Sequence, residues 1–227
     1  MKKVYWIDDN PSAMMQTIKN LFPLFWENNF NSQIFFVGDN YREHCENISR
    51  DRITLDSFDN TISKVFEDFC AEHIDEKNSA LNTPKKVREN NNKLSMNPCR
   101  SEEIVKDNNT DNLANFIAEK IDNDTFVGID IRLFSRDKDQ LEDIEGSYET
   151  LAMILYYLLS IDKTKNSTVF LYTSFLTPNL QERWEKQFKK YHPDYQNKIK
   201  IFARQKLVDD EKETEELLEL LNKEGDI

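Results

Sequence analysis

Acidic side chains follow two short apolar segments of the chain. Asp8 and Asp9 come directly after Val4–Ile7, and Asp130 stands near the end of Phe126–Ile131. Clustered carboxylates repel one another unless a cation neutralises them, and Mg²⁺ favours hard oxygen ligands of this kind. An aspartate can also act as a nucleophile toward a phosphoryl group, forming an aspartyl-phosphate intermediate. The three aspartates are therefore candidates for a metal site, with Asp130 as the candidate nucleophile.

Further polar groups follow two later apolar segments. Thr173 comes directly after residues 168–172, and Arg204 and Lys206 come after residues 199–203. A threonine hydroxyl can donate a hydrogen bond to a phosphoryl group. A cation can offset the charge on phosphoryl oxygens during transfer. We therefore expect Thr173 and a cation near Asp130, and the spacing leaves open whether Lys206 or Arg204 supplies that cation.

The elements that would position these groups are short apolar segments alternating with helical patterns. Buried strands are predicted at residues 3–7, 33–37, 126–131, 168–172 and 199–203. Apolar residues spaced three and four apart predict helices between and after them, and Pro23 is expected to kink or shorten the first helix. The alternation predicts an α/β, flavodoxin-like fold: a five-stranded parallel sheet of order 2-1-3-4-5 with helices on both faces. Right-handed crossovers would then gather the carboxyl ends of all strands at one edge, where ligands bind.

Residues 41–109 do not follow this alternation. We interpret them as a helical or disordered insertion between the second and third strands of a single domain spanning residues 1–227. Within it, residues 53–75 carry an apolar helical stripe, which would pack against the core or across a homodimer. Residues 77–100 hold six basic residues and one acidic residue, and are expected to form a flexible basic loop.

Composition excludes several classes of function. The 227 residues include 30 basic and 42 acidic side chains, a formal net charge of −12, so DNA binding is not expected. Only four glycines occur, and the Gly-rich phosphate loops of nucleotide-binding proteins are absent. The longest apolar run, Leu151–Leu159, has nine residues, whereas a membrane-spanning helix needs about twenty. Three widely spaced cysteines and no targeting segment favour a reduced, cytoplasmic compartment.

Three segments resemble the strand motifs of response-regulator receiver domains, the phosphoacceptor modules of two-component systems and phosphorelays. They are VYWIDDNP at 4–11, VGIDIRL at 127–133 and LYTS at 171–174, similar to the first-, third- and fourth-strand motifs. The resemblance covers five strands in the right order, and so nearly all of the chain outside the insertion. It implies a receiver-like signalling protein, in an atypical or pseudo-receiver form.

The resemblance also implies roles for particular residues. By it, Asp8, Asp9 and Asp130 hold Mg²⁺ together with the backbone carbonyl of Arg132. Asp130 is the phosphoacceptor, and Thr173 is the switch hydroxyl. Receivers usually have a Lys-Pro pair after the fifth strand. The nearest match here is Lys206 followed by leucine, so that cation is Lys206, is replaced by arginine, or is missing. The implied partners are a histidine kinase or phosphotransfer protein and an output protein of unknown identity.

Three functions are compatible with these residues. The first is a stand-alone receiver, in which Mg²⁺-dependent phosphorylation of Asp130 controls partner binding, with no enzymatic activity beyond the turnover of its own aspartyl phosphate. The second is a non-phosphorylated pseudo-receiver that acts as an adaptor. The third is a metal-dependent phosphoesterase or nuclease, with extra acidic ligands from the segment that follows Asp130: Asp137, Asp139, Asp143 or Glu145. The overall negative charge, which repels nucleic acid, counts against the third.

Overall fold

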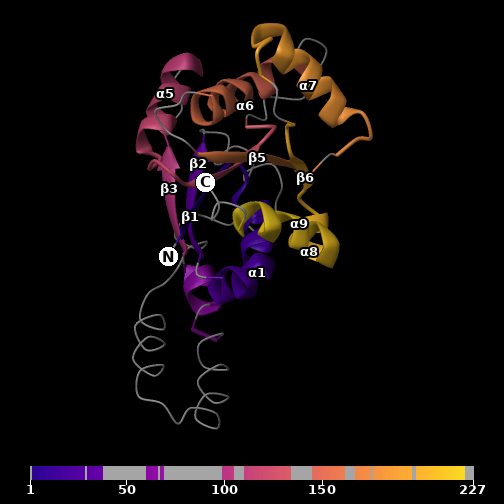
Figure 1. Cartoon of the computed structure of the whole chain (residues 1–227). Coiled ribbons are helices and arrows are strands. Elements are labelled where there is room, and N and C mark those ends of the chain that lie inside the picture. Colours follow the sequence, from indigo (N-terminus) through magenta and orange to yellow (C-terminus); the bar gives the residue numbers. More distant parts are fainter. Residues whose placement is uncertain are drawn as a thin grey trace.

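The computed structural model describes most of the chain outside the long insertion. The described residues are 2–28, 30–37, 60–65, 67–68, 99–104, 110–133, 145–161, 167–174, 176–195 and 198–222. They form one parallel sheet with helices on both sides (Figure 1). The basic loop expected up to residue 100, apart from its last two residues, lies outside the described residues. So do the acidic positions 137, 139 and 143.

Five strands confirm the predicted flavodoxin-like α/β arrangement. In chain order they are β1 (Lys2–Asp8), β2 (Phe30–Val37), β4 (Phe126–Asp130), β5 (Thr168–Thr173) and β6 (Ile201–Ala203). They lie in the order β2-β1-β4-β5-β6, and every neighbouring pair is parallel, which is the predicted order 2-1-3-4-5. Near-continuous apolar strands favour this arrangement because both faces of such a sheet are covered by helices.

A sixth strand, β3 (Cys99–Ile104), extends the sheet beyond β2. It runs parallel to β2, from the pair Ser32–Cys99 to the pair Val37–Ile104. The expectation of a loop through residue 100 is therefore wrong for its last two residues, and the end of the insertion is part of the sheet. The strand CRSEEI has no alternating apolar pattern, and charged residues are well tolerated in a strand at the edge of a sheet.

Helices cover the two faces of the sheet in two groups. On one face lie α1 (Pro11–Glu27), α8 (Lys206–Asp209) and α9 (Glu211–Asn222). On the other lie α5 (Thr110–Lys120), α6 (Glu145–Ser160) and α7 (Leu180–Tyr191) (Figure 1). Successive residues of β1 enter opposite cores, because side chains alternate along a strand: Trp6 packs on the α1 side and Ile7 on the α6 side. The position of a residue along its strand thus decides which face its side chain reaches.

Two helical predictions can be compared with the described residues. Residues 60–65 and 67–68 are helical, within the helix expected at 53–75, and Ile62 is buried in the core on the α1 side. Of the two effects expected at Pro23, a kink or a shortening, the shortening is wrong, since α1 continues through Pro23 to Glu27, and the kink stays a prediction. Leu21 and Phe25 are buried on either side of the proline, and their packing offsets the backbone hydrogen bond that a proline removes.

Candidate metal and phosphoacceptor site

The ends of β1 and β4 place two of the predicted aspartates side by side. Ile7 pairs with Ile129, so the next residues, Asp8 and Asp130, leave their strands together and point to the same face. Asp9 follows immediately. One carboxylate oxygen from each of the three aspartates lies within 4.8 Å of the others. The structure therefore brings together the three acids that the sequence proposed for a metal site.

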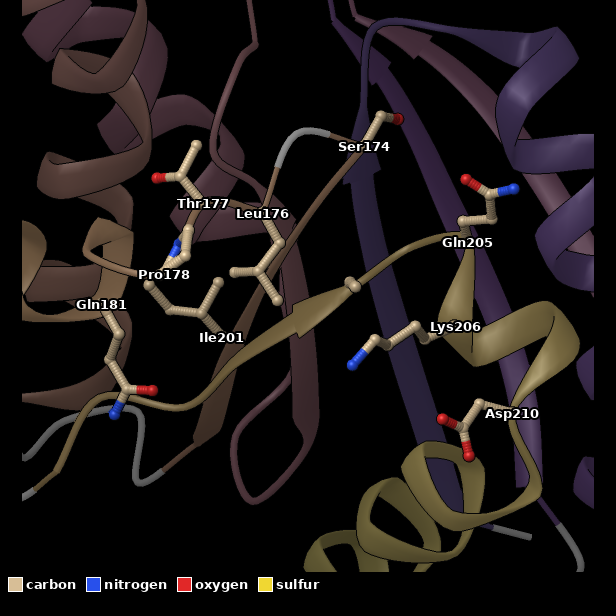
Figure 2. Close-up of a pocket in the computed structure, with 10 residues that line it drawn as sticks. Ser174, Leu176, Thr177, Pro178, Gln181, Ile201, Gln205, Lys206 and Asp210 are labelled. Atoms are coloured by element: carbon tan, nitrogen blue, oxygen red, sulfur yellow. The ribbon is translucent and has the colours of Figure 1, made fainter.

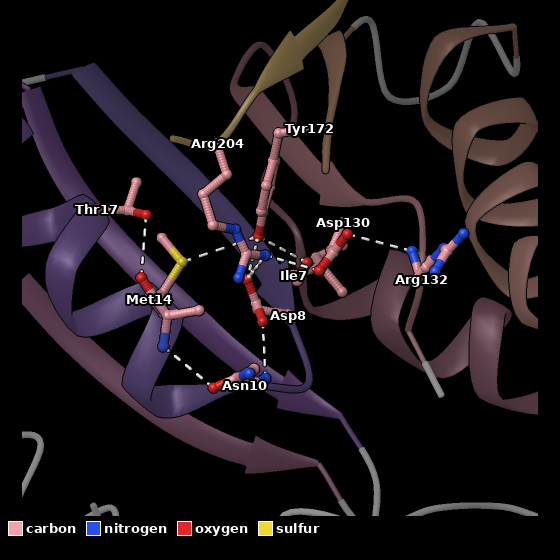
Figure 3. A network of polar contacts seen from close by, with 10 residues as sticks. Ile7, Asp8, Asn10, Met14, Thr17, Asp130, Arg132, Tyr172 and Arg204 are labelled. Carbon is pink, nitrogen blue, oxygen red and sulfur yellow. Dashed lines mark hydrogen bonds and ion pairs between the residues drawn. The ribbon is translucent and has the colours of Figure 1, made fainter. Parts of the chain in front are cut away.

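Arg204 is the cation inside this cluster. Its Nη2 donates to Asp8 Oδ2 at 2.5 Å and to Asp130 Oδ2 at 2.6 Å (Figure 3). Arg204 stands two residues after Phe202, which packs on the α1 side, so the strand alternation carries its side chain to the same face. The guanidinium also lies 4.9 Å from the centre of the Tyr172 ring, a favourable cation–π arrangement.

The other oxygens of the two buried aspartates also have donors. Asp8 Oδ1 accepts from the backbone N–H of Asn10 at 2.7 Å, and Asp130 Oδ1 accepts from that of Arg132 at 3.2 Å. The Tyr172 hydroxyl donates to Asp8 Oδ2 at 2.9 Å (Figure 3). All four carboxylate oxygens are thus hydrogen-bonded. A metal ion that binds these residues would share an oxygen with these donors or take its place.

The cluster nevertheless retains an excess of negative charge. Three carboxylates and one guanidinium carry a formal charge of −2 when all are ionised. Burial raises the pKa of Asp130 to about 7, the Arg204 guanidinium opposes that rise, and the charge of Asp8 adds to it. Burial, and then the charges of Asp8 and Asp130, raise the pKa of Asp9 well above its usual value. Asp9 makes no ion pair with any residue in the described part of the chain.

These residues fit a divalent cation. The donors are hard carboxylate oxygens, which Mg²⁺ prefers, and an ion of charge +2 would neutralise the cluster. Asp8, Asp9 and Asp130 would hold it, and the Arg132 carbonyl, two residues beyond Asp130, is the backbone group proposed to join them. Asp9 would gain most from such an ion, because Arg204 forms ion pairs with Asp8 and Asp130 and not with Asp9.

Thr173 stands at the same edge of the sheet. It ends β5 directly after Tyr172, which pairs in register with Asp130, and it is buried. Its backbone carbonyl accepts a hydrogen bond from the backbone N–H of Arg204 at 2.9 Å. The structure therefore places Thr173 between the strand of the candidate phosphoacceptor and the arginine that contacts it.

Lys206 lies apart from the aspartates. It begins α8, its side chain is 57% exposed, and it makes an ion pair with Glu213 at 3.9 Å. Figure 2 shows it projecting into a groove beside β6 that Leu176 and Ile201 also line. Among the described residues, the cation that pairs with Asp130 is Arg204, not Lys206. Of the two cations that the sequence left open, the structure brings only the arginine to the cluster.

Tyr172 is a member of the site that the sequence did not single out. Its buried hydroxyl donates to Asp8 Oδ2 and also lies 3.0 Å from the backbone carbonyl of Ile7. Its position in the sequence could have identified it, because it stands one residue before Thr173 and pairs with Asp130 in the sheet. Glu145, a candidate ligand in the nuclease hypothesis, begins α6, and its side chain lies outside the described part of the structure.

Comparisons with known proteins do not place the chain in a family. No family model matches the sequence, and a search of curated proteins finds no match either. None of the helices within the described ranges combines the length and apolar character that crossing a membrane requires.

Proposed function

We propose that this chain is a receiver-like signalling protein that accepts a phosphoryl group on Asp130 with the help of Mg²⁺, and that the modification changes its binding to a partner. The observation that carries the proposal is the convergence of Asp8, Asp9 and Asp130 at the carboxyl edge of a parallel sheet. That edge is where ligands bind in sheets of this kind. The resemblance of the three strand motifs to receiver domains supports the same residues.

Each residue near Asp130 then has a chemical task. An Asp130 carboxylate oxygen attacks the phosphorus of a phosphohistidine, carried by a histidine kinase or phosphotransfer protein. The O–P bond forms while the P–N bond to the imidazole breaks. Arg204, already bonded to Asp130, offsets charge on the phosphoryl oxygens, and Thr173 donates its hydroxyl to them. Mg²⁺, when bound by the aspartates, neutralises charge on the same oxygens.

The added charge also supplies a means of signalling. A phosphoryl group on Asp130 would compete with Asp8 for the guanidinium of Arg204, which now bonds both carboxylates. Arg204 directly follows β6 and lies just before α8, and the backbone N–H of Ala203 is bonded to Glu213 of α9 at 3.1 Å. A change in the contacts of Arg204 is therefore transmitted first to α8 and α9.

Intact-mass measurement tests this proposal. The full chain is incubated with Mg²⁺ and acetyl phosphate, and we expect one added phosphoryl group, which EDTA prevents. Asp130→Asn should remain unmodified. Asp194→Asn removes an exposed aspartate elsewhere and should be modified as the wild type is. No adduct on the wild type, or an adduct that persists in Asp130→Asn, would contradict the proposal.

A second candidate function is a pseudo-receiver, the same fold acting as an adaptor without phosphorylation. It is favoured by the closed hydrogen-bond network, in which Arg204 and the backbone already supply a donor to every oxygen of Asp8 and Asp130. In that case the chain takes up no phosphoryl group, and Mg²⁺ leaves its free energy of unfolding unchanged. Both results are the opposite of those expected for the receiver, so the two functions are separable with the same samples.

A further inference from the structure

Helix α6 carries apolar side chains on both of its sides. Leu151, Leu155 and Leu159 are fully buried against the sheet, as a covering helix requires. The opposite side carries Met153, Ile154, Tyr157 and Leu158, which are only partly buried. An amphipathic surface helix presents polar residues on its outer side, and a helix that is apolar all round is normally covered on every side. The outer side of α6 therefore has the composition of a covered surface.

A cavity of about 630 Å³ lies over this outer side, where residues of α5, α6 and α7 meet. Its apolar lining includes Ile154 and Tyr157 of α6 and Phe188 of α7. His192, which also lines it, stacks on Tyr157 with ring centres 4.0 Å apart and an angle of 13° between the planes. Small-molecule sites typically measure about 300–1,000 Å³ and combine apolar walls with a few polar groups. The size and lining fit one molecule with an apolar body.

Glu149 is the buried side chain among the polar residues that line this cavity, which also include Asp111, Asn115 and Lys190. It lines the cavity although only 5% of the residue is exposed. Arg183 Nη2 donates to Glu149 Oε1 at 2.5 Å, but Oε2 is buried and has no hydrogen-bond donor among the described residues. An unpaired buried acceptor costs about 1–3 kcal/mol, and most buried polar atoms in folded proteins are paired. A donor held in the cavity would complete the hydrogen bonding of this carboxylate.

We propose that the cavity binds a small organic cation, an amine or amidine carried on an apolar body. The charged N–H group would donate to Glu149 Oε2, and a hydrogen bond between two charged groups is stronger than one between neutral groups. The apolar body would cover Met153, Ile154 and Tyr157. The cavity lies on the face of the sheet opposite the cluster around Asp130, and the proposal does not depend on the receiver function.

Three probes with the same apolar body test the proposal: phenylbutylamine, phenylbutanol and phenylbutyrate. Each is titrated into the full chain and followed by ligand-observed NMR and calorimetry. We expect the amine to bind at least about tenfold more tightly than the alcohol, a difference of about 1.4 kcal/mol, and the anion to bind most weakly. Glu149→Gln should remove the preference for the amine. Glu215→Gln, which removes an exposed charge from α9 on the other face, should retain it.

A second variant keeps the test decisive if Glu149→Gln is poorly folded. Ile154→Trp fills the cavity and leaves the Glu149–Arg183 pair in place, so it should reduce the binding of the amine and the alcohol alike. Equal affinity for amine and alcohol would overturn the proposal, because it would show that the cavity does not recognise the positive charge. Absence of binding by all three probes, or amine binding that Ile154→Trp does not change, would also overturn it.

Discussion

The cluster around Asp130 and the cavity at Glu149 both pair buried carboxylates with an arginine, but they leave different atoms without a partner among the described residues. Within the described ranges, every carboxylate oxygen of Asp8 and Asp130 has a donor while Arg204 Nε has no acceptor, and Glu149 has a donor for Oε1 alone. The arginines differ as well. The side chain of Arg204 is 7% exposed, and that of Arg183 is 35% exposed.

The difference shows that hydrogen-bond satisfaction and charge balance are separate properties of a site. The carboxylate oxygens of Asp8 and Asp130 all have donors, yet the cluster carries an excess of negative charge, so a divalent ion bound there would have to compete with existing donors. The charge of Glu149 is balanced by Arg183, but Oε2 has no donor in the described part of the chain, so a ligand could be added there without displacing a contact. The first arrangement suits a site where a bound ion replaces existing hydrogen bonds. The second suits a site where a ligand adds a hydrogen bond and replaces none.

The largest expected effect comes from removing each arginine in turn. Arg204→Ala leaves two buried carboxylates without their cation and should lower the free energy of unfolding by about 3–5 kcal/mol. Arg183→Ala should cost less, about 1–3 kcal/mol, because Arg183 is partly exposed and its loss leaves one buried carboxylate, not two, without a donor. Urea denaturation measures both, with Lys206→Ala as a nearly neutral control. Equal losses for the two arginines would remove the distinction between the sites.

The pH dependence of stability should come from the Asp130 side of the comparison. Because burial raises the pKa of Asp130 to about 7, the folded chain binds this proton more tightly than the unfolded chain does. In EDTA, the free energy of unfolding should therefore fall as the pH rises from 5 to 8, by an amount on the order of a few kcal/mol. The fall should be smaller in Asp130→Asn. Curves of equal slope for the two proteins would contradict this reading of the cluster.

The effect of Asp9→Asn on stability should have opposite signs in the presence and absence of metal. Its pKa is raised by burial and by two neighbouring carboxylates, so its charge destabilises the folded chain when no metal is bound. Asp9→Asn should therefore raise the free energy of unfolding by about 1 kcal/mol in EDTA. The same variant should lose the stabilisation that Mg²⁺ gives to the wild type. A variant that is destabilised in EDTA would show that Asp9 serves the fold rather than a cation.

The smallest effect is expected at Glu149. Glu149→Gln removes a partly screened ion pair and leaves a side chain of the same size. The free energy of unfolding should therefore change by about 1 kcal/mol or less. Asp8→Asn, the matched change in the closed network, should cost clearly more because Arg204 and Tyr172 both donate to Asp8. Urea denaturation of the two variants measures both losses of stability. A larger loss for Glu149→Gln than for Asp8→Asn would contradict the expected order.

The cluster at the sheet edge was largely predictable because the alternation of side chains along strands is a local rule. Asp8 and Asp130 follow apolar strands, and the rule sends them to one face. Counted from Phe202, the same rule sends both Arg204 and Lys206 to that face, and Lys206 is separated from the cluster because it lies beyond the strand in the first turn of α8. The resemblance to receivers pointed instead to the lysine, because that family places a lysine after its fifth strand.

Two features could not be predicted from local patterns. β3 is polar, and its pairing with β2 depends on a chain segment returning to the edge of the sheet after more than sixty intervening residues. The cavity depends on the spacing of three helices and on which oxygen of Glu149 meets Arg183. Nothing in the sequence around Glu149 distinguishes it from an ordinary acidic residue near the start of a helix.

The proposed function requires that Asp8, Asp9 and Asp130 bind one cation together. Calorimetric titration of the full chain with Mg²⁺ tests it directly, with Asp9→Asn titrated under the same conditions. We expect one ion to bind per wild-type chain and none to bind to Asp9→Asn. No binding to the wild type, or equal binding to both proteins, would contradict it.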